Sequence, residues 1–411
     1  MYTHPEKSFR KRLVFNMSSR KPPQIGKAPV PKNFGRMLAD NFDWWEEALN
    51  MDIPQGLWDD LQRSKAKAIE LDDTRNTPVA VEVAGMFFQL LPTGAKGGRE
   101  FVLINEKYRI ELASPKKEWC IKWRATSAAL WEFKIGDIRD GLYEVLENAG
   151  CTPKDKQDYL RLSRVDYCFD IFSPAFTTQM HPRIVSATVC PRETKARGDF
   201  VVQGSQVETL TIGTGSTCQV QIYDKTKEIT EASNKTWLYD IWNFDSETGE
   251  IRKQDLTSDV WRVEIRLKKD WLKSRKVNKP DAFIEKMQSL LGEAIYNRRL
   301  CQRTKDSNRR RWPLHPLFVM VLDRIGNPTS FMEIDRRPTG RANYISQMIQ
   351  QNIAGSLRSL TVLHLRNHGV FTAEEAERQM KRIFEKMLDD EQHDEKIRRS
   401  QEKYELVDSY K

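Results

Sequence analysis

Tyr223 is the residue of this sequence whose type and setting come closest to those of a nucleophile. Val220 and Ile222 alternate with polar neighbours, which is the period of a half-buried strand, and this phase puts Tyr223 on the polar face. Because phenol ionises only at about pH 10, attack at neutral pH needs a cation or a base nearby. Lys225, two residues further on, would supply the cation. A packing tyrosine shows the same pattern, so the segment alone leaves both interpretations open.

Two other segments repeat this alternation of apolar and charged residues. Residues 164–171 read RVDYCFDI and residues 261–267 read WRVEIRL, each with every second residue apolar. If the three strands share one sheet, their polar faces bring together several arginines with Asp166, Asp170, Glu264, Tyr223 and Lys225. Carboxylates beside cations on a rigid sheet favour a metal site next to an anion site. A solvated sheet face with cross-strand ion pairs is the alternative interpretation.

The elements that would position these side chains predict an α+β fold. We expect an antiparallel central sheet with helices on one face, followed by a mainly helical C-terminal domain. Gly213, Gly215 and Ser216 predict the turn of a hairpin whose second strand carries Tyr223. The apolar patterns predict further strands within 78–125 and near 200–203, and helices over 40–71, 136–149, 281–299, 314–325, 343–365 and 372–403.

The order of these segments resembles the replication initiation factor family, of the Rep_trans type. The resemblance is carried by RVDYCFD, then a Gly/Ser turn leading into IYDKTKE, then WRVEIRLK, and it spans roughly residues 80–275. Members of this family start rolling-circle replication of plasmids and of some filamentous phages, and relatives act as conjugative relaxases. The resemblance therefore implies a site-specific, metal-dependent DNA nickase in the cytoplasm of a bacterial host cell.

The resemblance also implies roles for individual residues. Tyr223 would attack a phosphodiester and leave a 5′-phosphotyrosyl bond and a free 3′-hydroxyl, with Lys225 stabilising the phenolate. Asp166 and Glu264 would hold Mg²⁺ or Mn²⁺, with Asp170 as a further ligand. The residues expected to contact DNA are Arg164, Arg262, Arg266 and Lys227. The partners would be single-stranded or extruded origin DNA, a host helicase and polymerase, and a second copy of the chain in a homodimer.

Charge and composition divide the chain into segments. Its 411 residues carry a net charge of +9, which favours a polyanionic partner. Residues 1–36 hold nine Lys or Arg against one Glu, together with several prolines, so we expect a disordered basic arm. We predict a helical lead-in at 37–77, a catalytic nicking domain at 78–275 and a helical C-terminal domain at 280–411. A basic cluster at 298–311 is a candidate phosphate-binding segment, with a solvated face as the alternative.

Motifs that the sequence lacks narrow the function further. The six cysteines show no C-x-x-C spacing, which indicates reduced thiols. The six histidines do not form the His-hydrophobe-His motif of the better-known rolling-circle nickases, so a metal would be coordinated by carboxylates. They also do not form the H-x-x-R motif of tyrosine recombinases. No G-x-x-x-x-G-K-[ST] motif occurs, so unwinding would fall to a separate helicase. No run of about 18 apolar residues predicts a membrane span.

Three functions are consistent with the sequence. A rolling-circle replication initiator is the leading hypothesis, and a conjugative relaxase shares its chemistry. The third is a DNA-binding regulator without catalysis, in which Tyr223 is a structural residue. Nicking by the folded protein would separate the third function from the first two. Neighbouring genes for a coupling ATPase or for phage coat proteins would separate the first two from each other.

Overall fold

The structure, a computed structural model, contains fifteen strands and nine α-helices in the part of the chain that it describes. The described residues are 26–71, 77–177, 182–190, 199–203, 206–213, 217–244, 256–326, 372, 377–378 and 381–382. The strands are β1 (Arg36–Leu49), β2 (Met51–Asp52), β3 (Val79–Val83), β4 (Met86–Leu90), β5 (Arg99–Ile104), β6 (Tyr108–Ala113), β7 (Ile121–Ala125), β8 (Thr152–Pro153), β9 (Leu160–Phe172), β10 (Thr188–Val189), β11 (Asp199–Gln203), β12 (Gln206–Gly213), β13 (Cys218–Asp224), β14 (Val260–Lys268) and β15 (Arg299–Leu300). The helices are α1 (Gln55–Leu71), α2 (Ser127–Glu132), α3 (Ile135–Asn148), α4 (Pro174–Thr177), α5 (Lys225–Glu228), α6 (Trp237–Asn243), α7 (Lys269–Ser274), α8 (Pro280–Asn297) and α9 (Pro316–Ile325).

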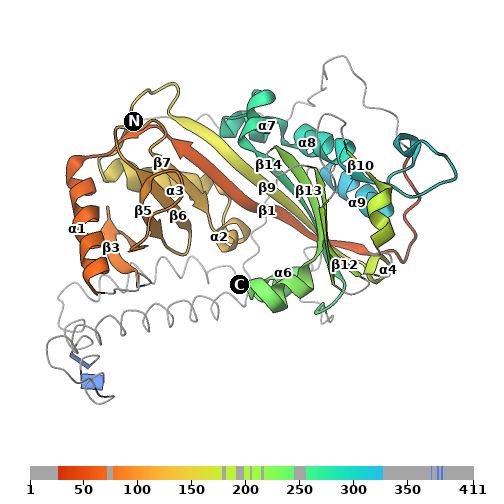
Figure 1. Cartoon of the computed structure of the whole chain (residues 1–411), viewed down its shortest axis with the longest axis horizontal. Helices are drawn as coiled ribbons and strands as arrows, with labels where there is room; N and C mark the ends of the chain where they lie inside the picture. The colour runs from red at the N-terminus through yellow and green to blue at the C-terminus, as the bar shows by residue number, and fades with distance from the viewer. Residues whose placement is uncertain are drawn as a thin grey trace.

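Eleven of these strands form one antiparallel sheet, in the order β11-β12-β13-β14-β9-β1-β7-β6-β5-β4-β3. The long strands β1 and β9 run through the middle of the molecule and pair with each other (Figure 1). The predicted α+β fold with an antiparallel central sheet is confirmed. The hairpin that ends in Tyr223 is confirmed as β12 and β13, with its turn at 214–216 outside the described residues.

The two faces of the sheet pack differently. On the apolar face, side chains such as Tyr167 and Phe169 join a large core that includes residues of α1, α3, α8 and α9. Cys168 lies between them in β9 and so points to the opposite face, where it packs in a second, smaller core with Trp131 of α2 and Trp242 of α6. The helices that we expected on one face are present there, and short helices also cover part of the opposite face. For example, α6 and α8 lie on opposite sides of β13 and β14 (Figure 1).

The first long strand is where the sequence prediction was wrong. The helix expected over 40–71 begins only at Gln55, and residues 36–49 form β1 instead. The pairing of β1 with β9 shifts register at three places, between Met37 and Ala39, between Phe42 and Trp44, and between Glu46 and Glu47. The first two shifts insert a residue in β1, and the third inserts one in β9. Each insertion in β1 reverses the phase of the alternation, so the apolar residues no longer recur at every second position.

Other predicted elements are confirmed close to their expected bounds. The helices expected at 136–149, 281–299 and 314–325 are α3, α8 and α9. Gly150 follows α3 with a φ of 82°, the left-handed conformation that a residue after a helix end often takes. The helices predicted at 343–365 and 372–403 lie almost wholly outside the described residues. None of the helices in the described part of the chain combines the length and the apolar character of a membrane span.

The end of the predicted basic arm is packed rather than disordered. Residues 1–25 lie outside the described part, but Ala28 and Phe34 are buried against the body of the protein. Lys27 forms a bridge to Leu314 and an ion pair of 2.6 Å with Asp323. The amide of Ala28 donates to the carbonyl of Leu314, and the Ser173 hydroxyl donates to the carbonyl of Phe34. The segment 26–36 is therefore part of the folded domain.

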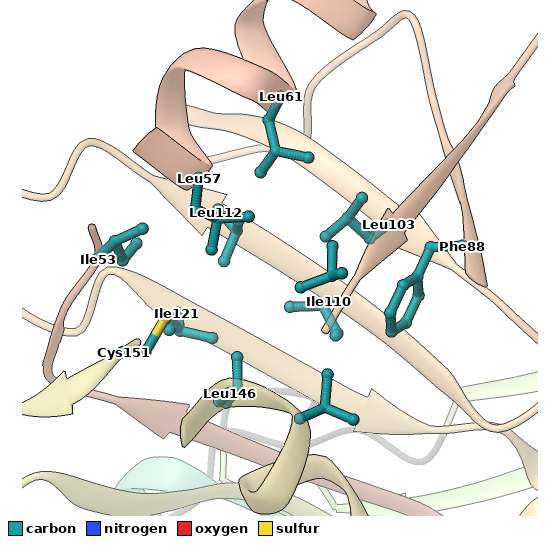
Figure 2. A pocket seen from close by; sticks show the side chains of 12 residues that line it. Ile53, Leu57, Leu61, Phe88, Leu103, Ile110, Leu112, Ile121, Leu146 and Cys151 are labelled. Atoms are coloured by element: carbon teal, nitrogen blue, oxygen red, sulfur yellow. The ribbon is translucent and has the colours of Figure 1, made fainter. Parts of the chain in front are cut away.

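The core beneath α1 is closed and carries no ligand site. Figure 2 shows aliphatic side chains of α1, the sheet and α3 pointing toward one another, among them Leu61, Leu103, Ile121 and Leu146. The free space between them is only about 10 Å³. A buried water needs at least about that volume and two or more polar partners, whereas this lining is apolar.

Trp45 tests how far the sheet depends on its core. Its side chain is fully buried, and its indole N–H donates to Glu47 Oε1 at 2.7 Å. We expect Trp45→Ala to lower the free energy of unfolding in urea by about 3–5 kcal/mol, because it leaves a large cavity. Phe87→Ala is the control, since Phe87 is 68% exposed and its loss is expected to change stability by less than about 0.5 kcal/mol. Equal losses in the two variants would contradict this view of the core.

Candidate active site

Tyr223 lies at the end of β13, with its hydroxyl directed at a carboxylate on the neighbouring strand. It is the last residue but one of the strand, and Asp224 then caps α5 by accepting from the Lys227 amide at 3.0 Å. The Tyr223 hydroxyl donates to Glu264 Oε2 at 2.7 Å. Burial, together with the negative charge of Glu264, raises the pKa of Tyr223 well above its ordinary value. Tyr223 is therefore a protonated phenol whose proton already points at a base.

Glu264 and Asp166 form a pair of buried carboxylates held by arginines. They are 2% and 1% exposed, respectively. Arg266 Nε donates to Glu264 Oε1 at 2.6 Å and lies 3.7 Å from Asp166 Oδ2, while Arg164 Nε donates to Asp166 Oδ1 at 2.9 Å. The sequence predicted these four residues for one site, and the structure brings them together.

The two carboxylates differ in their affinity for a proton. Burial and the neighbouring charge of Glu264 raise the pKa of Asp166 to about 7, although the bond from Arg164 opposes this. Burial acts on Glu264 in the same direction, but the charge of Arg266 outweighs it and lowers the pKa of Glu264. Asp166 is therefore the more readily protonated of the two, and Glu264 stays ionised beside the tyrosine.

Asp170 and Arg262 lie next to this site but are fully occupied with each other. They face each other across β9 and β14, and both are 0% exposed. Arg262 donates to both carboxylate oxygens of Asp170, at 2.6 and 2.8 Å, and the Trp242 indole N–H donates to Oδ2 at 2.9 Å. Both oxygens of Asp170 are therefore occupied by hydrogen bonds, and Arg262, which is fully buried and also lies 3.1 Å from Asp43, has no surface that could contact DNA.

Lys225 and Lys227 sit on α5 rather than on the strand. Lys225 is buried, pairs with Glu228, and has its ammonium 5.8 Å from the centre of the Tyr223 ring. Burial and the charge of Arg262 lower the pKa of Lys225. Lys227 pairs with Glu208. Lys225 is thus near enough to act electrostatically on Tyr223, whereas Lys227 lies further along the helix with a carboxylate of its own.

Asp43 is a charged residue of the site that the sequence analysis missed. Its Oδ1 accepts from the Ser127 hydroxyl at 2.8 Å and lies 3.1 Å from Arg262 Nη1. Burial raises the pKa of a carboxyl, but the nearby charges of Lys235, Arg262 and Lys225 more than offset this and lower the pKa of Asp43. Asp43 reaches the site because it occupies the β1 bulge between Phe42 and Trp44, and only knowledge of that bulge could have placed it there.

The basic cluster at 298–311 is largely used within the protein. Arg298 and Arg299 are buried, and Arg299 donates to the Tyr296 carbonyl at 2.6 Å. Arg311 pairs with Asp306 at 2.6 Å, and Arg309 donates to the Ser186 carbonyl at 3.2 Å. The density of charge in this segment therefore reflects internal hydrogen bonding as much as a surface for phosphate.

The donor set of the carboxylate pair suits a hard divalent cation in part. Asp166 and Glu264 supply oxygens, but these already accept hydrogen bonds from Arg164, Arg266 and Tyr223, so a cation would have to displace some of those donors. Within the residues that the structure describes, no three His, Cys, Asp or Glu side chains converge as a metal site. Mg²⁺ usually keeps several waters and needs only one or two carboxylates, so two ligands are compatible with it.

Comparisons with known proteins give a weak structural likeness. No family model matches the chain, and no curated protein matches it. Among solved structures, the chain is similar to one described as a rolling circle replication initiator protein from Geobacillus stearothermophilus. The identity is 14%, the match covers 70% of this chain and 96% of that chain, and the TM-score is 0.36. A score this low does not establish a common fold, so the function rests on the geometry of the site.

Asp166 should make the stability of the fold depend on pH. Because folding raises the pKa of Asp166 from 3.8 to about 7, the folded state keeps a proton that the unfolded state has released. This group therefore lowers the free energy of unfolding as the pH rises from about 4 to about 7. We expect Asp166→Asn to flatten the change in stability between about pH 4 and about pH 7, measured by urea unfolding. Asp281→Asn is the control, since Asp281 is 98% exposed, and an unchanged slope in Asp166→Asn would contradict the assignment.

Proposed function

We propose that this protein is a rolling-circle replication initiator that nicks one DNA strand at an origin through Tyr223. The observation that carries the proposal is the hydrogen bond from the Tyr223 hydroxyl to ionised Glu264, beside Asp166 and two arginines. A nucleophile with a raised pKa needs a base within hydrogen-bond reach, and Glu264 lies within that reach of Tyr223. The resemblance of the three strand motifs to replication initiators agrees with this chemistry.

In the proposed reaction, the Tyr223 oxygen attacks the phosphorus of a phosphodiester while Glu264 accepts the phenolic proton. The new bond joins phosphorus to the tyrosine oxygen, and the bond from phosphorus to the 3′-oxygen breaks. The 3′-oxygen takes a proton from water and becomes the hydroxyl that a polymerase extends. Lys225 and Arg266 would stabilise the negative charge that develops on the phosphoryl group. Reversal of the same steps religates the strand without a separate energy source.

The substrate is proposed to be single-stranded or extruded origin DNA. Tyr223 is only partly exposed and Glu264 is buried, so a phosphodiester can reach the phenol more readily from a flexible single strand than from a closed duplex. We propose Mg²⁺ or Mn²⁺ as the cofactor, held by Asp166 and Glu264. When bound, it would polarise a phosphoryl oxygen and neutralise charge. A host helicase, a polymerase and a second copy of the chain complete the proposed partners.

A conjugative relaxase would use the same residues, so the site alone favours neither replication nor transfer. A DNA-binding regulator without catalysis is the remaining alternative. It predicts that Tyr223 can be replaced by phenylalanine with no loss beyond one hydrogen bond. The two classes of function therefore differ in what happens to DNA, which a nicking assay measures directly.

The nicking assay uses supercoiled plasmid that carries the gene and its flanking DNA, incubated with Mn²⁺. We expect open circles with protein bound covalently to the 5′ end, no such product with Tyr223→Phe, and a rate at least about 100-fold lower with Glu264→Gln, because the base is lost. Tyr159→Phe is the matched control and should nick as the parent does. Nicking that survives in Tyr223→Phe would move the nucleophile elsewhere, and binding without nicking by the parent protein would favour the regulator.

The proposed metal site can be tested without DNA. Calorimetric titration of the whole protein with Mn²⁺ should show one binding event that is weakened at least about tenfold in Asp166→Asn. Since the cation competes with the proton on Asp166, affinity should also fall as the pH drops below about 7. Asp281→Asn should bind as the parent does. Equal affinity in Asp166→Asn would place any metal at another site.

A further inference from the structure

An arginine and tryptophan cluster lies on the same sheet face as Tyr223 and is not used by the proposed reaction. It is centred on Trp44 of β1, whose neighbour Trp45 points into the apolar core. The guanidinium of Arg124, from β7, lies 4.1 Å from the centre of the Trp44 ring, and that of Arg164, from β9, lies 4.2 Å from it. Trp44 thus holds two guanidinium groups from the two flanking strands in fixed positions.

This cluster concentrates like charges. Arg109 of β6 is the register partner of Arg124, so the two side chains project from the same face of adjacent strands. Glu46 of β1 is the register partner of both Arg124 and Arg164, and its carboxylate pairs with Lys122 at 3.1 Å. Arginine side chains side by side repel one another, and a bound anion relieves that repulsion.

Arg124 is the arginine of the cluster whose N–H groups have no acceptor among the described residues. Arg109 Nε donates to Glu111 Oε1 at 2.9 Å, and Arg164 is paired with Asp166. Arg124 forms neither a hydrogen bond nor an ion pair with any described residue, and only its flat face is engaged, by Trp44. Burial and the charge of Arg109 lower the pKa of Arg124, and the charges of Glu46 and Glu111 oppose this only in part. Its N–H groups are therefore available to an external acceptor.

The cluster is joined to the nucleophile by direct contacts. From Tyr223 the chain of contacts runs through Glu264, Arg266, Asp166 and Arg164 to Trp44 and Arg124. It crosses β13, β14, β9, β1 and β7, which are consecutive strands of the sheet (Figure 1). Four strand spacings correspond to about 19 Å. A single strand with one phosphate at Tyr223 would reach this cluster with a phosphate several nucleotides away.

We propose that Arg124, held by Trp44 between Arg109 and Arg164, is a second phosphate-binding site that grips single-stranded DNA at a distance from the bond that is cut. The inference rests on the proposed function, and it adds residues that fix the path of the strand. The guanidinium fork matches two phosphate oxygens, and stacking on Trp44 pre-orients it. Because the contact is made to backbone phosphate, it gives affinity and direction but not sequence preference.

Binding of a fluorescent 20-nucleotide single strand, measured by anisotropy in the Tyr223→Phe background, tests the proposal without cleavage. We expect Arg124→Gln to weaken binding about tenfold and to reduce the slope of log affinity against log salt by about 0.7, the value for one phosphate contact on a single strand. Arg124→Lys should restore part of the affinity, since it keeps the charge but loses the fork. Arg63→Gln, at an exposed arginine of α1, is the matched control and should bind as the parent does.

The outcomes separate this inference from the proposed function. Unchanged affinity and salt slope in a folded Arg124→Gln variant would overturn the inference of a phosphate site. The same holds if the variant binds DNA as the parent does and differs only in a lower melting temperature. If Tyr223→Phe still nicks DNA but Arg124→Gln binds weakly, the phosphate site stands and the nucleophile is wrong. If Tyr223→Phe is inactive and Arg124→Gln binds normally, the nucleophile stands and the phosphate site is wrong.

Discussion

The pairing of β1 with β9 is the constraint on which the rest of this structure depends. In the described sheet, the strands from β3 to β7 connect to those from β11 to β14 only through this pair. The pairing makes one continuous polar face, on which Tyr223 and Arg124 lie four strands apart. Its bulges also turn Asp43 toward the carboxylate site and Trp44 toward the arginines. A change that broke this pairing would therefore divide both the sheet and the site.

Charge balance within the polar face is the second condition for the site. Asp170 with Arg262, Asp166 with Arg164, and Glu264 with Arg266 each place a buried carboxylate against a guanidinium. A buried charge that loses its partner costs about 3–5 kcal/mol, so these residues are interdependent. The result is a fixed arrangement in which Glu264 remains ionised beside the tyrosine, while burial raises the pKa of Asp166 to about 7.

Alternation let the sequence predict β9, β13 and β14 and the residues that share their polar face. Tyr223, Glu264 and Asp166 meet as expected because these strands pair in regular register, without bulges between them. The same logic failed for β1, where two bulges interrupt the period and the apolar residues resemble a helical pattern. Asp43 and the position of Trp44 could not be inferred for that reason.

The sequence also could not show how charges divide among partners. Asp170 and Glu264 look alike in their strand motifs, since each alternates with apolar residues on a charged face. The Asp170 carboxylate nevertheless accepts hydrogen bonds from Arg262 and from the Trp242 indole, while Glu264 accepts from the Tyr223 hydroxyl. Which carboxylate stays available depends on α6 and on the register of β14 against β9, and these are properties of tertiary structure.

Asp40 has a consequence for the order in which this chain can fold. It is buried in β1, accepts from the Tyr167 hydroxyl at 2.7 Å, and is neutralised by Arg324 of α9, which lies 284 residues later in the sequence. During synthesis the first strand is made early, but its charged partner emerges only after the whole sheet. In a chain still attached to the ribosome, Asp40 of β1 would therefore lack its charged partner until α9 has emerged. The domain can be completed only late in synthesis.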